Sequence, residues 1–121
     1  MNAKEEEILK ETIQFYSEDT SRRASFDSKG SFYVYDDKMC ALGRYLLDPH
    51  KFRIFISNLK VTEDLTDERL DEWVKPEGKG CTVRFWNRLQ VLHDNPLFWN
   101  KKGLTERGQS FVNYRFYNIT E

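Results

Sequence analysis

The stretch Cys81-Thr82-Val83-Arg84-Phe85-Trp86-Asn87-Arg88-Leu89-Gln90-Val91-Leu92-His93 carries the strongest helical signal in this chain. Its apolar residues recur at helical spacing and form a wide stripe, which consists of Phe85, Trp86, Leu89, Leu92 and His93. The pattern predicts an amphipathic helix that buries this stripe in the core and ends at Asn95-Pro96. Arg84 and Arg88 lie side by side next to the stripe.

Other segments also have helical periodicity and suitable capping residues. The predicted helices run over Lys4–Tyr16, Lys38–Leu47 after a possible cap at Asp36-Asp37, Thr66–Val74 and a last segment that Thr105 can cap. In the last segment the alternation of Val112, Tyr114 and Phe116 leaves a strand as the alternative, although a helix is favoured.

Two short runs of β-favouring residues, Phe32–Tyr35 and Phe52–Ile56, predict strands. Polar or turn-rich segments predict loops at Ser17–Ser31 and Pro76–Gly80, and Pro96–Trp99 is expected to pack as a hydrophobic loop lid. We therefore expect a single α+β domain over residues 1–121, mostly helical with a short antiparallel strand pair. In this fold the Cys40 helix would pack against the Cys81 helix.

Composition limits the classes of function. Because 19 Lys and Arg residues nearly cancel 20 Asp and Glu residues, the net charge is −1, which argues against binding long nucleic acid. The acidic start lacks the apolar segment of a signal peptide, and no window approaches the roughly twenty apolar residues that span a bilayer. A cytoplasmic protein with reduced Cys40 and Cys81 is expected.

Two polar segments, Cys40-Ala41-Leu42-Gly43-Arg44 and Leu89-Gln90-Val91-Leu92-His93-Asp94, contain groups that can bind a charged small molecule or perform nucleophilic chemistry. A thiol, a guanidinium, an imidazole and a carboxylate are the groups concerned. We interpret the two segments as one site, in which Cys40 and His93 are expected to lie within one side-chain layer.

These motifs, in this order, resemble a family of small, mostly uncharacterised proteins of phages and prophages. The resemblance rests on Ser21-Arg22-Arg23-Ala24, the segment from Tyr35 through Cys40-Ala41-Leu42-Gly43-Arg44, Leu89-Gln90-Val91-Leu92-His93-Asp94, Trp99 and Gly103-Leu104-Thr105-Glu106-Arg107-Gly108. The segment Thr62–Gly80 departs from the family pattern and looks like an insertion. The resemblance implies a phage-type accessory protein acting against host defence in the host cell cytosol, and it brings no catalytic assignment.

The favoured function is binding and sequestering a small anionic nucleotide, such as a host immune signal. Arginines would hold the phosphates and an aromatic ring (Tyr35, Trp86 or Trp99) would stack on the base. The candidate ligand-binding residues are Arg22, Arg23, Tyr35, Cys40, Gly43, Arg44, Arg84, Arg88, His93, Asp94 and Trp99. The simpler interpretation treats Arg84 and Arg88 as a solvated stripe that covers apolar surface.

Two other classes of function remain open. A cysteine-dependent enzyme would use Cys40 as nucleophile, His93 as base, and Asp94 or Asn95 to orient the base, although such a Cys is more often a core residue. An inhibitor of a host defence protein would use an exposed aromatic patch of Phe98, Trp99 and Tyr114–Tyr117, although these rings are more often core.

Neither a cofactor nor a metal is predicted. A zinc site from Cys40, Cys81, His50 and His93 lacks paired ligand spacing. A homo-oligomer is expected, because eighteen aromatic residues supply more ring surface than one small core hides.

Overall fold

The computed structural model of the chain describes residues 1–23, 34–35, 38–39, 41–48 and 65–119. Four α-helices dominate this part: α1 (Ala3–Glu18), α2 (Asp67–Trp73), α3 (Val83–Asp94) and α4 (Glu106–Arg115). Short 3₁₀ turns connect them: η1 (Thr20–Arg22), η2 (Gly43–Tyr45), η4 (Pro76–Gly78) and η5 (Pro96–Phe98). Two antiparallel hairpins pair β1 (Val34–Tyr35) with β2 (Lys38–Met39) and β3 (Trp99–Asn100) with β4 (Gly103–Leu104). The mostly helical α+β fold expected from the sequence is confirmed.

Each α-helix begins at a residue whose side chain accepts a hydrogen bond from a backbone N–H of the first turn. Thr66 caps α2, Thr82 caps α3 and Thr105 caps α4, while Asn2 caps α1. Of the five helices predicted on capping and periodicity, four are therefore confirmed, and the exception is Lys38–Leu47. The last predicted segment is a helix and not a strand.

Glu5 connects the starts of two helices that are far apart in sequence. Its Oε1 accepts a hydrogen bond from the backbone N–H of Asn2 at 3.0 Å, which completes a capping box on α1. Its Oε2 accepts hydrogen bonds from the backbone N–H and the hydroxyl of Thr82, at 3.1 and 3.2 Å. The carboxylate is 5% exposed and fully occupied by these donors.

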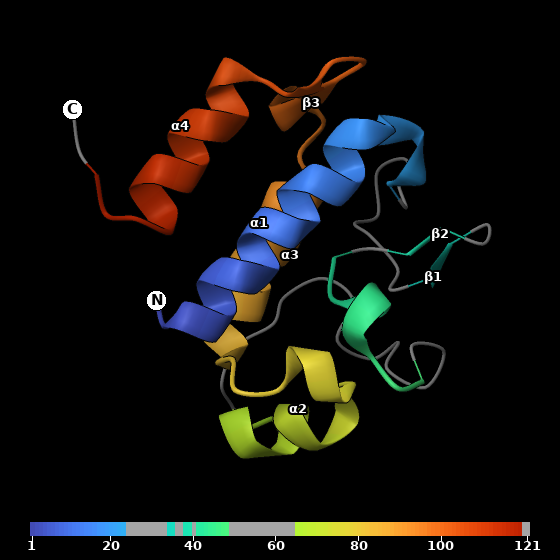
Figure 1. Cartoon of the computed structure of the whole chain (residues 1–121), viewed down its shortest axis with the longest axis vertical. Helices are drawn as coiled ribbons and strands as arrows, with labels where there is room; N and C mark the ends of the chain where they lie inside the picture. Colours follow the sequence, from blue (N-terminus) through green and yellow to red (C-terminus); the bar gives the residue numbers. More distant parts are fainter. Residues whose placement is uncertain (24–33, 36–37, 40, 49–64, 120–121) are drawn as a thin grey trace.

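The core lies between α1 and α3, which passes behind α1 in Figure 1, with α4 on one side of α1 and the paired strands β1 and β2 on the other. Trp86, Leu89 and Leu92 of α3 are fully buried against Leu9 and Tyr16 of α1. The buried stripe predicted on the Cys81–His93 segment thus forms the centre of the fold. In the described residues, no helix is both long and apolar enough to cross a bilayer.

The helix predicted over Lys38–Leu47 is wrong. Lys38 and Met39 pair with Tyr35 and Val34 in a hairpin, and the chain then turns through η2. Long-range contacts hold this path: the Leu42 N–H donates to Gln90 Oε1 on α3 at 2.9 Å, and Leu46 forms a β-bridge with Val74. These contacts outweigh the local preference for a helix. The expected packing of two helices is replaced by packing of the η2 segment on α3.

The predicted loops and strands have mixed outcomes. Val34–Tyr35 is a strand as predicted, whereas Phe52–Ile56 lies outside the described residues. In Ser17–Ser31, α1 extends to Glu18 and η1 follows. Pro96–Trp99 forms η5 and the start of the β3–β4 hairpin, which brings Gly103 against α1. Gly103 has φ +115°, and a Cβ there would lie 2.9 Å from the Ser17 side chain.

Candidate functional site

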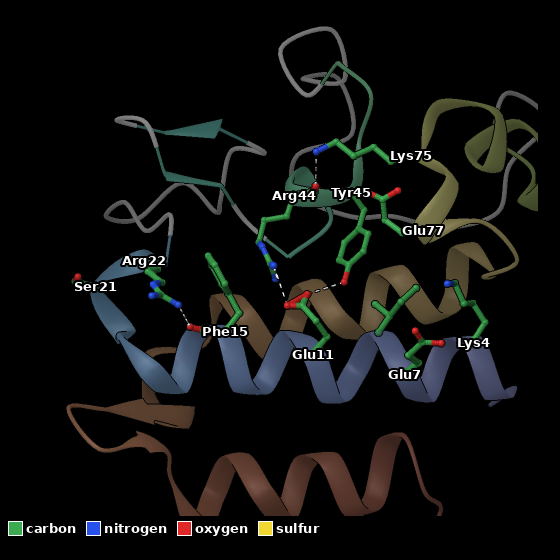
Figure 2. Close-up of a pocket in the computed structure, with 11 residues that line it drawn as sticks. Lys4, Glu7, Glu11, Phe15, Ser21, Arg22, Arg44, Tyr45, Lys75 and Glu77 are labelled. Carbon is green, nitrogen blue, oxygen red and sulfur yellow. Dashed lines mark hydrogen bonds and ion pairs between the residues drawn. The ribbon is translucent and has the colours of Figure 1, made fainter.

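A cleft of about 850 Å³ lies between α1 and the η2 segment. Figure 2 shows the side chains that line it, which come from α1, η1, η2 and the chain around η4. The lining residues are Lys4, Glu7, Ile8, Glu11, Phe15, Ser21, Arg22, Arg44, Tyr45, Lys75 and Glu77. The volume falls within the range of ordinary small-molecule sites, about 300 to 1,000 Å³.

The floor of the cleft is one face of α1. Lys4, Glu7, Ile8, Glu11 and Phe15 follow one another at intervals of one, three or four residues, so their side chains share a face of the helix. Because a helix rises about 1.5 Å per residue, this face extends for roughly 16 Å. The η2 segment lies across it in Figure 2.

Glu11 joins the floor to the η2 segment. Arg44 Nη2 donates to Glu11 Oε2 at 2.9 Å, and the Tyr45 hydroxyl donates to Glu11 Oε1 at 2.6 Å. Burial alone would raise the pKa of Glu11, but the hydrogen bonds from Arg44 and Tyr45 and the Arg44 charge outweigh it and lower the pKa. Burial and the adjacent Glu11 carboxylate raise the pKa of Tyr45 above its usual range. Glu11 is therefore ionised and Tyr45 is a neutral donor.

Two guanidinium groups contact the ring of Phe15. The Arg44 guanidinium carbon lies 3.6 Å from the ring centroid, and that of Arg22 lies 4.5 Å from it. Arg22 Nη1 also donates to the Phe15 carbonyl at 2.9 Å and pairs with Glu18 at 3.2 Å. Contacts to one aromatic side chain thus bring the predicted ligand residues Arg22 and Arg44 together at one end of the cleft.

Charge is distributed unevenly along the cleft. Ser21 and Arg22 lie at one end, whereas Lys4, Glu7 and Glu77 lie toward the other in Figure 2. The end with Arg22 can bind an anionic group of a ligand. The carboxylates at the other end can accept hydrogen bonds from the ligand.

His93 belongs to a second, buried cluster. Its side chain has 0% exposure, its Nδ1 lies 2.7 Å from Asp94 Oδ1, and Tyr16 packs edge-on against it at 5.1 Å. Arg23 Nε donates to the His93 carbonyl at 2.8 Å, and its guanidinium carbon lies 5.8 Å from the Trp99 ring. Burial lowers the pKa of His93, against the opposing effect of Asp94. The structure therefore brings Arg23, His93, Asp94 and Trp99 together, but in a packed region away from the cleft lining.

The tryptophans expected to stack on a base are buried instead. Trp86 is 0% exposed and Trp99 is 6% exposed, and the Trp99 Nε1 donates to the Leu92 carbonyl at 2.8 Å. Phe116 is also buried, whereas Tyr114 is 52% exposed. The core interpretation holds for Trp99 and Phe116, so the aromatic patch of Phe98, Trp99 and Tyr114–Tyr117 is not a continuous exposed surface.

Arg84 and Arg88 line a different, smaller pocket, beside the starts of α1 and α3 and the end of α4. Figure 1 places α4 and the η2 segment on different sides of α1. The two arginines are thus separated from Arg22 and Arg44. Gly43 is buried and begins η2, and Tyr35 lies in β1.

Cys40 and His50 lie outside the described residues, and so does the expected proximity of Cys40 to His93. Cys81 is a free, buried thiol, and burial raises its pKa to about 12. In the described part of the chain, no group of three or more His, Cys, Asp or Glu side chains is arranged to hold a metal.

Sequence reasoning missed Glu11, Phe15, Tyr45 and Lys75. The spacing of Lys4, Glu7, Glu11 and Phe15 on one face of the predicted Lys4–Tyr16 helix is the sequence signal for the floor. Tyr45 and Lys75 join it only through long-range contacts: the Lys75 N–H donates to the Tyr45 carbonyl at 2.7 Å, and Lys75 Nζ donates to the Arg44 carbonyl at 3.1 Å.

Comparison of the chain with protein-family models, with curated proteins and with solved structures finds no match.

Proposed function

We propose that the cleft between α1 and η2 binds and withholds a small anionic nucleotide. The observation that carries the proposal is the end of the cleft at which Arg22 and Arg44 contact the ring of Phe15 within a volume of about 850 Å³. A guanidinium group is a planar donor that suits phosphate oxygens, and an aromatic contact fixes its orientation before a ligand arrives.

The donors that remain for a phosphate belong mainly to Arg22. One of its terminal nitrogens is used by the Phe15 carbonyl and Glu18, which leaves the other terminal nitrogen and Nε. Arg44 has a more structural role, because its Nη2 is bound to Glu11 and its Nη1 is buried. Arg22 would thus contact the phosphate, and Arg44 would hold the Phe15 ring and the η2 segment in place.

The carboxylates in the cleft favour a compact ligand over a polyanion. Lys4, Arg22, Arg44 and Lys75 are opposed by Glu7, Glu11 and Glu77, so the described lining has four cations and three carboxylates. One or two phosphates near Arg22 would fit this balance, and a base amino group could donate to Glu7 or Glu77. A longer chain of phosphates would meet these carboxylates and be repelled.

The biological role rests on the resemblance to phage accessory proteins. A phage protein that holds a host nucleotide signal without turning it over lowers its free concentration and so blocks host defence. The buried position of His93 disfavours its use as the base of the enzyme alternative, while Cys40, the nucleophile of that alternative, lies outside the described residues.

Calorimetry and native mass spectrometry against cyclic dinucleotides, cyclic trinucleotides and cyclic ADP-ribose isomers test the proposal. One of these compounds should bind, and recovery of the intact compound after denaturation should show that it was not converted. Arg22→Gln should weaken binding about tenfold or more, because one charge-assisted hydrogen bond contributes roughly 1.5 to 3 kcal/mol. Arg107→Gln, which changes an exposed arginine on α4, is the matched control. Absence of binding across the panel, together with specific capture of a host protein, would favour the inhibitor alternative instead.

A further inference from the structure

A second basic site lies on the other side of α1, where α3 and α4 meet. Arg84 and Arg88 are four residues apart on α3 and share a face of that helix. Arg88 Nη1 donates to the backbone carbonyl of Arg115, the last residue of α4, at 2.9 Å. This hydrogen bond brings Arg88 to the end of α4, where Arg115 is a third basic residue.

These three arginines have no carboxylate partner in the described residues. The ion pairs found there join Lys10 to Glu6, Arg22 to Glu18, Arg44 to Glu11 and His93 to Asp94. The like charges affect one another: after burial, the neighbouring guanidinium groups of Arg84 and Arg115 are the causes that lower the pKa of Arg88. Grouping unpaired like charges destabilises a folded protein unless an anion joins them.

Arg84 and Arg88 line a pocket of about 300 Å³, whereas Arg115 lies outside the lining. Thr82, Phe85, Phe116 and Asn118 form much of the remaining lining, so polar groups and ring edges surround the two α3 arginines. Glu5 is the one carboxylate among the lining residues, and its oxygens are occupied by Asn2 and Thr82. The Glu5 carboxylate is therefore engaged by the helix starts, and among the described residues the one hydrogen bond made by the Arg84 and Arg88 guanidinium groups is that from Arg88 to the Arg115 carbonyl.

We propose that this pocket binds a phosphate group of a small phosphorylated compound through Arg84 and Arg88, with Arg115 adding positive charge beside them. A phosphate group presents oxygens in several directions and can accept from two guanidinium groups at once. A carboxylate accepts in one plane and can serve fewer of them. The three charges are confined to one place, which suits one phosphate and not a nucleic-acid backbone.

The site is independent of the nucleotide cleft. Neither Arg84 nor Arg88 lines the cleft, and neither Arg22 nor Arg44 lines this pocket. Failure of one proposal therefore leaves the other standing, and variants can separate them.

An NMR titration of the arginine Nε–H signals with inorganic phosphate, with ionic strength held constant by chloride, tests the inference. Signals of Arg84 and Arg88 should shift and saturate, and acetate should produce a weaker response at the same concentration. Arg84→Gln should weaken phosphate binding about tenfold, the loss expected for one charge-assisted contact. Arg84 is exposed and makes no hydrogen bond through its side chain in the described residues, so this variant should retain the wild-type circular dichroism spectrum.

Two control variants make the result specific. Arg107→Gln removes one exposed charge from α4, and Arg44→Gln alters the cleft; both should leave the response of Arg84 and Arg88 unchanged. Shifts that grow linearly without saturation, equal responses to phosphate and acetate, or loss of the response in Arg107→Gln would overturn the inference. Phosphate binding that Arg44→Gln removes and Arg84→Gln leaves intact would also overturn it, because the phosphate would then occupy the cleft.

Discussion

Mild acidification should destabilise the protein through His93. The imidazole is completely buried, and its Nε2 has no hydrogen-bond partner among the described residues. Protonation would therefore place a charged, unsatisfied N–H in the core beside the Tyr16 ring. Burial accordingly lowers the pKa of His93 below the usual 6.5, even though Asp94 favours the charged form.

The sign and size of the effect follow from proton linkage. Below pH 6.5 the unfolded chain protonates this histidine while the folded chain does not, so the unfolded state binds more protons and stability decreases as the pH is lowered. One such group gives a slope of at most about 1.4 kcal/mol per pH unit. Carboxylates such as Glu11, whose pKa is lowered from 4.5, add their own losses at more acidic pH.

Urea unfolding followed by tryptophan fluorescence between pH 5 and 8 measures this slope, since Trp86 and Trp99 are buried reporters. The free energy of unfolding should decrease as the pH falls below 6.5 in the wild-type protein. His93→Gln should flatten the decrease, whatever its effect on stability at pH 8, and His50→Gln should retain it. A flat wild-type profile, or an equal slope in His93→Gln, would refute the reasoning.

Three further outcomes are expected. Gly108→Ala should destabilise the fold by about 1 to 3 kcal/mol in thermal or urea unfolding. The new Cβ would lie 2.5 Å from Leu104 Cδ1 and 2.6 Å from a backbone carbonyl oxygen, so unchanged stability would contradict this packing. Glu11→Gln should weaken nucleotide binding about fivefold in calorimetry, because it removes the carboxylate that holds Arg44 and Tyr45 over α1, and Glu106→Gln should not; unchanged or tighter binding would refute that role. Cys81 should resist alkylation at pH 8 in the folded protein and react after unfolding, because burial raises its pKa to about 12. Peptide mapping measures the labelling, and rapid labelling of the folded protein would contradict this prediction.

The helices could be predicted because their signals are local. An apolar stripe on the Cys81–His93 segment and threonine caps before α2 and α4 depend on neighbours within four residues. The η2 segment could not be predicted in this way. Its path depends on the Gln90 side chain and on Val74, which lie far along the chain. A capping signal at Asp36-Asp37 is local and carries no information about these contacts.

The candidate site was predicted in its chemistry more than in its position. Arg22 and Arg44 both contact the Phe15 ring, and Arg44 also pairs with Glu11. Residues of α1 therefore bring the two arginines to one site, whereas the predicted partner segment ending at His93-Asp94 lies elsewhere. Sequence spacing on α3 placed Arg84 and Arg88 side by side correctly. It could not show that this pair turns toward α4, because that depends on how the helices pack.

The Glu5 carboxylate makes the beginnings of α1 and α3 a single cooperative unit. Each helix loses hydrogen bonds at its first turn if Glu5 moves away, although the residues it joins, Asn2 and Thr82, are 80 positions apart in sequence. Local fraying at one end should therefore expose the other, and the protected amides in the two first turns should exchange with solvent at similar opening free energies. Closing so long a loop is also slow, so full protection of the start of α1 should appear late in folding, after α3 has reached it.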